Sequence, residues 1–149
     1  IPNGLVLSTG EQRGRLVTVS DTCVTCASYS GRVEGSYDCG SSYLRAYSLG
    51  DEFTALLLNR YQAGNVGRLV TVDAEGAELG SLEIHEEVRS LSAAGRYLAV
   101  LYTDRLVVYN ENLQVYASLR GITGVSSAVM RPDGSALLFS TESASQFLP

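Results

Sequence analysis

The sequence of 149 residues predicts an all-β fold made of repeated four-stranded antiparallel meanders, for three reasons. Short apolar runs of strand length recur along the chain, and turns rich in Gly, Asn, Asp and Ser separate them. Nearly the same run occurs three times, as RLVTV (15–19), RLVTV (68–72) and RLVVY (105–109). No segment shows the apolar spacing of an amphipathic helix. The chain therefore consists of strands, and part of it is repeated.

The period of the repeat indicates which all-β architecture it forms. Residues 68–82 match residues 105–119 without a gap at an offset of 37, and residues 95–101 match 134–140 at an offset of 39. Periods near 40 residues with four strands each are typical of β-propeller blades. The sequence therefore predicts one partial β-propeller domain over residues 1–149.

The two central blades are expected to contain four strands each. In the third repeat the predicted strands are 88–92, 96–103, 104–110 and 113–119. In the second they are 43–49, 52–60, 67–73 and 77–83. Side chains alternate between apolar and polar from Leu113 to Leu119, which predicts a strand with one buried face.

The two terminal blades are expected to be incomplete. Residues 4–8, 15–20 and 22–30 are interpreted as the second, third and fourth strands of the first blade, followed by a long loop over 31–42. The last blade should contain a first, second and third strand, at 125–130, 135–141 and 144–148. The blade pieces are then about 4–30, 43–83, 88–119 and 125–148. About three and a half blades do not close a ring of ~4–8 blades, so the chain is expected to belong to a larger propeller or to pair with another copy through its open edges.

The segment MRPDGSALLFS (130–140) predicts a strand, a tight turn and a strand, because Pro, Asp and Gly suit successive positions of such a turn. It resembles the hairpin between the first two strands of blades in WD-repeat-like and quinoprotein-like β-propellers. Residues 50–149 also resemble the C-terminal part of an uncharacterised bacterial family of membrane-anchored propellers, a domain of unknown function. That resemblance implies an N-terminal membrane anchor, absent from this chain, and an extracytoplasmic location.

The composition excludes several classes of function. The net charge is −5 and all 11 basic residues are arginines, so the lysine of a P-loop or of a Schiff-base enzyme is missing. The acidic balance argues against a nucleic-acid partner. No apolar run approaches the ~18 residues that span a bilayer. A membrane contact would therefore depend on an anchor outside the sequence.

The cysteines have metal-binding or redox spacing at Cys23 and Cys26, with a third thiol at Cys39. Residues three apart on a strand point to opposite faces, which disfavours a shared metal ion. A reactive CxxC pair also needs a helix N-terminus that is not predicted here. Buried free thiols, or one disulfide to Cys39, are the favoured interpretations, and no metal or other cofactor is expected.

The other candidate groups for chemistry are a single histidine and a set of acids. His85 lies in EIHEEV (83–88), which lacks the second histidine of a zinc signature because Arg89 stands in its place. Acids at Glu75, Glu78, Glu83, Glu86 and Glu87 could form a glycosidase pair or a calcium site. A solvated acidic surface is the simpler interpretation.

Arg15, Arg68 and Arg105 each open one of the repeated runs, which are interpreted as the third strands of successive blades. A charge repeated at one blade position is expected to pair with a neighbouring carboxylate. The alternative is a ring of arginines that holds an anionic ligand.

The longer connections are expected on one face of the blades, where binding is commonest. They include 31–42, 61–67 and 120–125. The binding candidates on that face are Tyr37, Asp38, Tyr61, Asn65, His85, Glu86 and Glu87.

The sequence therefore favours a non-enzymatic β-propeller module that binds a protein, peptide or glycan, in the cell envelope or outside the cell. No catalytic residue is assigned. The alternative is a propeller enzyme, either a glycoside hydrolase or a quinoprotein-like oxidoreductase.

Overall fold

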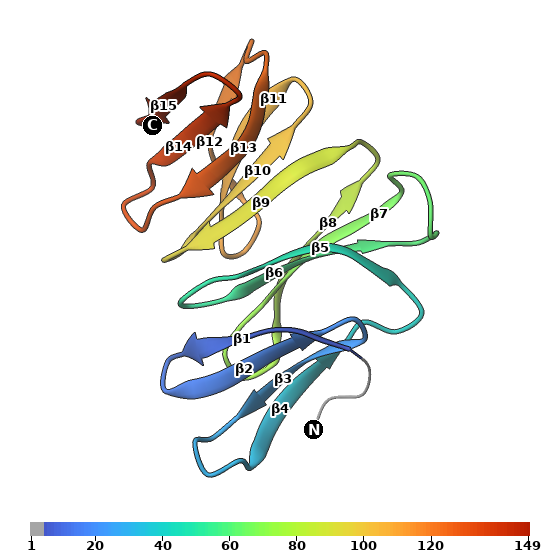
Figure 1. The fold of residues 1–149 in the computed structure, drawn as a ribbon. Coiled ribbons are helices and arrows are strands. Elements are labelled where there is room, and N and C mark those ends of the chain that lie inside the picture. The colour runs from blue at the N-terminus through green and yellow to red at the C-terminus, as the bar shows by residue number, and fades with distance from the viewer. Residues whose placement is uncertain (1–4) are drawn as a thin grey trace.

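The computed structural model describes residues 5–149, and in this range every regular element is a β-strand. The strands form four separate antiparallel sheets, in which each strand pairs with its neighbours in sequence. The all-β, propeller-like fold expected from the sequence is therefore confirmed. We call the sheets blades 1 to 4 in chain order (Figure 1).

The strands of each blade follow one another along the chain. Blade 1 contains β1 (Val6–Gln12), β2 (Arg15–Ser20), β3 (Cys23–Ala27) and β4 (Val33–Asp38). Blade 2 contains β5 (Tyr43–Leu49), β6 (Thr54–Asn59), β7 (Gly67–Val72) and β8 (Glu78–Ile84). Blade 3 contains β9 (Val88–Ala94), β10 (Tyr97–Tyr102), β11 (Arg105–Asn110) and β12 (Val115–Arg120). Blade 4 has three strands, β13 (Val125–Met130), β14 (Ala136–Ser140) and β15 (Ala144–Phe147).

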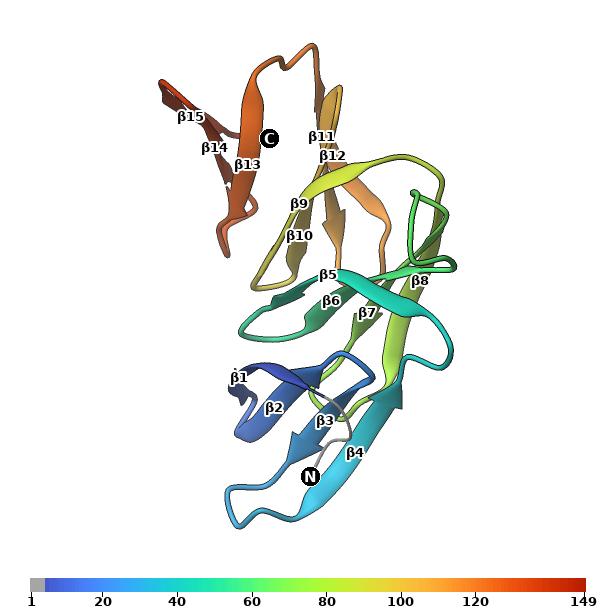
Figure 2. The same cartoon turned by 45° about the vertical axis from the view of Figure 1, so that its right-hand side comes forward.

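The blades are arranged in an open arc that does not close on itself. The first strands of successive blades, β1, β5, β9 and β13, lie next to one another, while Figures 1 and 2 show blades 1 and 4 at opposite ends of the molecule. A set of buried side chains fills each space between neighbouring blades. Val17, Leu56 and Val70 belong to the core between blades 1 and 2.

The strand assignment expected for blade 1 is wrong. Residues 15–20 form the second strand and not the third, and 31–42 is not one long loop, because β4 occupies its centre. The composition was misleading, since Gly and Ser usually mark loops. Gly35 has a packing reason instead: a Cβ at this position would overlap the carbonyl oxygen of Glu75 in blade 2.

Blade 2 packs against blade 3 in the same way. A Cβ on Gly80 of β8 would lie 2.6 Å from the carbonyl oxygen of Asn112. In both blades a glycine in the fourth strand lets the third turn of the next blade approach the backbone. Gly35 and Gly80 therefore mark the joints between blades.

The turns confirm the repeat of 37 residues. The Asp73 carboxylate accepts hydrogen bonds from the backbone N–H groups of Glu75 and Ala77. The Asn110 side-chain carbonyl does the same for Asn112 and Gln114. The short side chain of Asp or Asn thus stabilises each turn from its first residue. The predicted hairpin of blade 4 is also present, with Met130 paired to Ala136.

Candidate functional site

The connections between strands divide between two faces of the arc. Antiparallel order places the links between first and second strands, and between third and fourth strands, on one face, which we call the turn face. It comprises residues 13–14, 28–32, 50–53, 73–77, 95–96, 111–114 and 131–135. The remaining connections form the loop face, residues 21–22, 39–42, 60–66, 85–87, 103–104, 121–124 and 141–143. In Figure 1 the tips of the first hairpins of the blades mark the turn face on the left.

The structure places most of the predicted binding residues on the loop face. Tyr61 and Asn65 are exposed in the loop between β6 and β7, and the Asn59 side chain fixes this loop by donating to the carbonyl oxygen of Gly64 at 2.9 Å. His85, Glu86 and Glu87 form the connection between β8 and β9.

Tyr37 and Asp38 lie in β4 and not in a loop. The Tyr37 hydroxyl donates to Glu78 at 2.9 Å and accepts from the Arg68 guanidinium at 3.2 Å. Burial, followed by the bond to Glu78, raises the pKa of Tyr37. Asp38 accepts a hydrogen bond from the backbone N–H of Gly40. Both side chains therefore contribute to the structure around β4.

The seven predicted residues are not held together as one site. Glu86 bonds to Arg105, Tyr37 bonds to Glu78 and Arg68, and His85 lies 3.9 Å from Glu83. These contacts run to other side chains and do not connect the candidates to one another.

The loop face nevertheless contains a hollow of about 250 Å³ between the β4–β5 connection and blade 2. Its lining residues are Ser41, Ser42, Leu58, Arg60, Gly67, Arg68 and Glu83. Arg60 is exposed, and its guanidinium forms no hydrogen bond or ion pair within the described residues.

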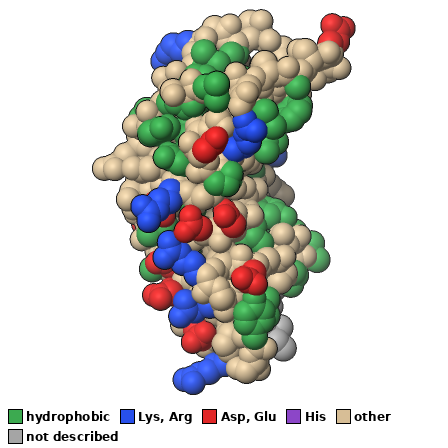
Figure 3. Space-filling model, turned by 90° about the vertical axis from the view of Figure 1, so that its left-hand side faces the viewer, with side chains coloured by type: hydrophobic (Ala, Val, Ile, Leu, Met, Phe, Trp, Pro, Cys, Tyr) green, Lys and Arg blue, Asp and Glu red, His purple; other side chains and the backbone are tan. Residues whose placement is uncertain are grey.

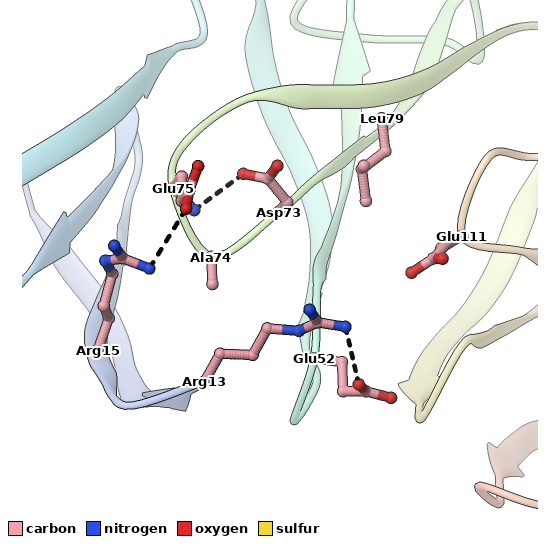
Figure 4. A pocket seen from close by; sticks show the side chains of 8 residues that line it. All are labelled: Arg13, Arg15, Glu52, Asp73, Ala74, Glu75, Leu79 and Glu111. Atoms are coloured by element: carbon pink, nitrogen blue, oxygen red, sulfur yellow. Dashed lines mark hydrogen bonds and ion pairs between the residues drawn. The ribbon is translucent and has the colours of Figure 1, made fainter.

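A second hollow, of about 260 Å³, lies on the turn face (Figure 4). Its lining residues come from blades 1, 2 and 3: Arg13, Arg15, Glu52, Asp73, Ala74, Glu75, Leu79 and Glu111. They meet because the third turns of blades 2 and 3 and the first hairpins of blades 1 and 2 lie on the same face. Figure 3 shows arginine and acidic side chains intermixed on this side of the molecule.

Most charged groups of the turn-face hollow are already paired. Arg13 contacts Glu52 at 3.1 Å, and Arg15 lies 3.6 Å from Glu75 (Figure 4). Arg15 also lies 3.4 Å from Glu34. The Asp73 carboxylate accepts the turn hydrogen bonds described above.

Glu111 differs from the other acids of this hollow. Its backbone carbonyl accepts a hydrogen bond from the Thr71 hydroxyl at 2.6 Å, which fixes its position between blades 2 and 3. Glu111 is partly buried as a residue, and its carboxylate has no partner within the described part of the chain. With four acids and two arginines in the lining, the hollow has an unbalanced negative charge beside Glu111.

The turn-face hollow was not predicted from the sequence, because binding was expected at the long connections. The acids of the third turns, in DAEG (73–76) and NEN (110–112), were the available signal. The two turns are 37 residues apart, at equivalent positions of blades 2 and 3, and therefore lie on the same face.

The three repeated arginines do not lie on one face of the arc. Each one pairs with a carboxylate, as expected. Arg15 begins a second strand at the turn face, whereas Arg68 and Arg105 begin third strands at the loop face. Arg105 forms two hydrogen bonds to Glu86, at 2.7 and 2.9 Å, and its guanidinium lies 4.1 Å from the centre of the Tyr102 ring. The structure gives the repeated arginines a role in joining strands.

All three cysteines are free thiols. Cys26 is in the core between blades 1 and 2, and burial raises its pKa to about 11. Burial also raises the pKa of Cys39 to about 11. Raised values oppose formation of the reactive thiolate. Within residues 5–149 no group of His, Cys, Asp and Glu has the arrangement of a metal site.

The four consecutive antiparallel sheets define the class of this chain as a β-propeller-like arc. Solved structures of propellers are similar to it: the WD40 domain of Pan2 from Neurospora crassa (TM-score 0.56, 13% identity, 89% of this chain and 41% of that one), and BamB from Moraxella catarrhalis (TM-score 0.58, 12% identity, 97% and 42%). The chain thus spans about two fifths of each of these proteins.

The computationally designed protein Ika4 is similar over nearly its whole length. Its TM-score is 0.67 at 13% identity, with 99% of this chain and 92% of that chain covered. No family model and no curated protein matches the sequence. Among the described residues there is no helix long and apolar enough to cross a membrane.

Proposed function

We propose that the chain is a propeller-type scaffold that binds a protein segment on its turn face and receives a basic side chain beside Glu111. The observation that supports this most directly is the carboxylate of the partly buried Glu111, which has no partner within the described residues and lines a hollow with more acids than arginines. A cationic side chain is the natural complement of such a carboxylate. The propeller-type neighbours support a binding scaffold in general.

The size of the hollow favours a side chain over a free small molecule. Its volume of about 260 Å³ lies below the ~300–1,000 Å³ of typical ligand pockets. One arginine side chain, with its planar guanidinium and apolar stem, is of suitable size, and Leu79 and Ala74 provide apolar contact for the stem. The remaining residues of a bound segment would lie across the intermixed charges of Figure 3.

The proposal is tested with a short peptide that has a central arginine and one aspartate. We expect the peptide to bind, and Glu111→Gln to weaken binding by about fivefold, equivalent to ~1 kcal/mol for one partly exposed charge pair. Isothermal titration calorimetry measures both affinities. The matched peptide with citrulline in place of arginine keeps the shape and removes the charge. Equal affinity for the two peptides, or no effect of Glu111→Gln, would contradict the proposal.

The hollow on the loop face supports a second candidate, closer to the binding face expected from the sequence. Its exposed Arg60 guanidinium and the hydroxyl groups of Ser41 and Ser42 suit an anionic group on a partner. A phosphoserine peptide is the probe, and Arg60→Gln should weaken its binding while leaving the arginine peptide unaffected. Tyr61 and Asn65, in the same loop as Arg60, remain predicted contacts of this candidate.

Glu86, one of the acids that the sequence suggested, is not suited to act as a glycosidase acid. A glycosidase acid needs a carboxyl group with a raised pKa. The hydrogen bond from Arg105 instead lowers the pKa of Glu86. Membrane anchorage and an extracytoplasmic location remain predictions of the sequence resemblance.

A further inference from the structure

We infer that the outer edge of blade 3 binds an extended acidic segment of a partner protein, which adds a fifth strand beside β12. β12 is the last strand of its sheet, so it pairs with β11 on one side alone. Within the described residues, no segment other than β11 is hydrogen-bonded to the backbone of Val115–Arg120. Alternate N–H and C=O groups of such an edge strand point outwards and can pair with an added strand.

The position of this edge does not depend on where the arc begins or ends. Blade 3 has a neighbour on each side, because β9 contacts β5 of blade 2 and β13 of blade 4. Further blades of a longer chain would continue the arc beyond blade 1 or blade 4. The first strands contact one another along the inside of the arc, so β12 lies on the outside. Further blades would leave this edge uncovered.

β12 differs from the outer strands of blades 1 and 2 in its side chains. β4 (VEGSYD) and β8 (ELGSLEI) each contain two acids and one glycine. Charges on an edge strand oppose pairing with a further strand, and glycine weakens a strand. β12 (VYASLR) contains no acid and no glycine. Val115 and Tyr116, which are residue types that favour strands, are 66% and 51% exposed. β12 is therefore the outer strand best suited to accept an acidic segment.

A hollow of about 230 Å³ lies along β11 and β12 and determines which side chains the added strand needs. Its lining residues are Arg105, Val107, Tyr109, Val115, Ser118 and Arg120. The hollow is on the side of blade 3 that faces blade 2, because Val107 and Tyr109 belong to the core between these two blades. Every second side chain of an added strand points to this side. An apolar side chain of the segment can therefore contact Val107 and Val115.

Arg120 provides the charge that selects an acidic segment. Arg105 is already paired, since it donates two hydrogen bonds to Glu86 and one to Asp104. Arg120 lies 3.9 Å from Asp104, beyond hydrogen-bond distance, and its side chain is 74% exposed. None of the described residues that line the hollow is an acid. A carboxylate on the added strand can therefore form a hydrogen-bonded pair with the Arg120 guanidinium.

The same charge favours a partner segment over a second copy of this chain. If two β12 strands paired in antiparallel order about a two-fold axis, Arg120 of each copy would lie opposite Val115 of the other. Such a pair offers Arg120 no carboxylate. A separate segment in antiparallel order places an acid near its N-terminus beside Arg120, and an apolar residue near its C-terminus beside Val115.

A peptide of the same length as β12 tests the inference. The probe has glutamate near its N-terminus, leucine near its C-terminus on the same side of the strand, and threonine at the other positions. We expect isothermal titration calorimetry to show binding, and Arg120→Gln to weaken it about fivefold, as for one exposed charge pair. Arg89→Gln removes the same charge from the innermost strand β9, where Arg89 is exposed. This matched control should leave the affinity unchanged. Glu111→Gln should not weaken the binding either, so the result is independent of the turn-face hollow.

Methylation of the peptide's backbone amides distinguishes strand addition from a contact through charge alone. Successive amides of an extended peptide point alternately towards β12 and towards solvent. Methyl groups on one alternate set should weaken binding by at least about tenfold, because several hydrogen bonds are lost. Methyl groups on the complementary set should leave it unchanged.

Equal affinity for the two methylated peptides would overturn the inference. No binding of the probe, or the same affinity in the Arg120→Gln variant, would overturn it as well. Sedimentation equilibrium tests the remaining alternative. A dimer that the probe dissociates would assign the edge of β12 to a second copy and would also overturn the inference.

Discussion

At the scale of single residues, glycines in fourth strands decide how closely the blades approach. Gly35 and Gly80 pair with Cys26 and Thr71 in the preceding strands. The Thr71 hydroxyl bonds to the Glu111 carbonyl of blade 3, and the Cys26 thiol lies 4.0 Å from the Asp73 carbonyl oxygen of blade 2. At each joint, therefore, a glycine allows the next blade to approach, and the residue paired with that glycine contacts a backbone carbonyl of the next blade.

Gly35→Ala should destabilise the protein because the new Cβ would overlap the carbonyl oxygen of Glu75. Overpacking of this kind costs about 1–3 kcal/mol in free energy of unfolding. Urea unfolding measures the change, and Ser36→Ala on the same strand serves as the control, with an expected change within ~0.5 kcal/mol. A Gly35→Ala protein as stable as the wild type would show that the blades are farther apart than described.

The buried thiols make stability depend on pH in the alkaline range. Burial raises the pKa of Cys26 from 9.0 to about 11, so the folded protein keeps a proton that the unfolded chain releases. The stabilisation is present below pH 9 and is lost as pH rises from about 9 to about 11. Replacing Cys26 by Ala should reduce the dependence on pH over this range, although the cavity also lowers stability at neutral pH. Thermal unfolding at pH 7 and pH 10.5 measures the difference, and equal pH dependence in both proteins would contradict the burial of Cys26.

At the scale of elements, the sequence predicted the strands of blades 2 and 3 well. Their apolar runs are bounded by turn residues, and β6 (Thr54–Asn59) lies within the predicted strand over 52–60. β4 was not predicted, because VEGSYD (33–38) has few apolar residues. Its glycine lets the backbone of β4 pack against blade 2. A contact between two blades cannot be predicted from the sequence of one strand.

Amide hydrogen exchange tests the correction at β4. The backbone pairs Cys23–Asp38, Val24–Tyr37 and Thr25–Ser36 should protect the hydrogen-bonded amides of β4. The exposed loop residues 61–65 are the internal reference and should exchange quickly, whereas the Arg60 amide is hydrogen-bonded to the Val66 carbonyl oxygen. Equal exchange rates in the two segments would restore the original interpretation of 31–42 as a loop.

At the scale of the whole molecule, the sequence predicted the propeller class and its open ends. It favoured the loop face for binding, whereas we propose the turn face. The repeat predicts that the short turns share one face. Binding was expected on the other face because its loops are longer. The turn-face hollow combines residues from three blades, among them Arg13, Asp73 and Glu111. Residues so far apart in sequence could be brought together only by the arc.

A protein segment bound on the turn face should place a basic side chain beside Glu111. Backbone amide chemical shifts, recorded by NMR while the arginine peptide is added, test it most directly. We expect the shifts to concentrate at Ala74, Glu75 and Glu111 and to weaken at high salt, because a charge pair is screened. Shifts concentrated at residues 60–66, or shifts of the same size with the citrulline peptide, would contradict it.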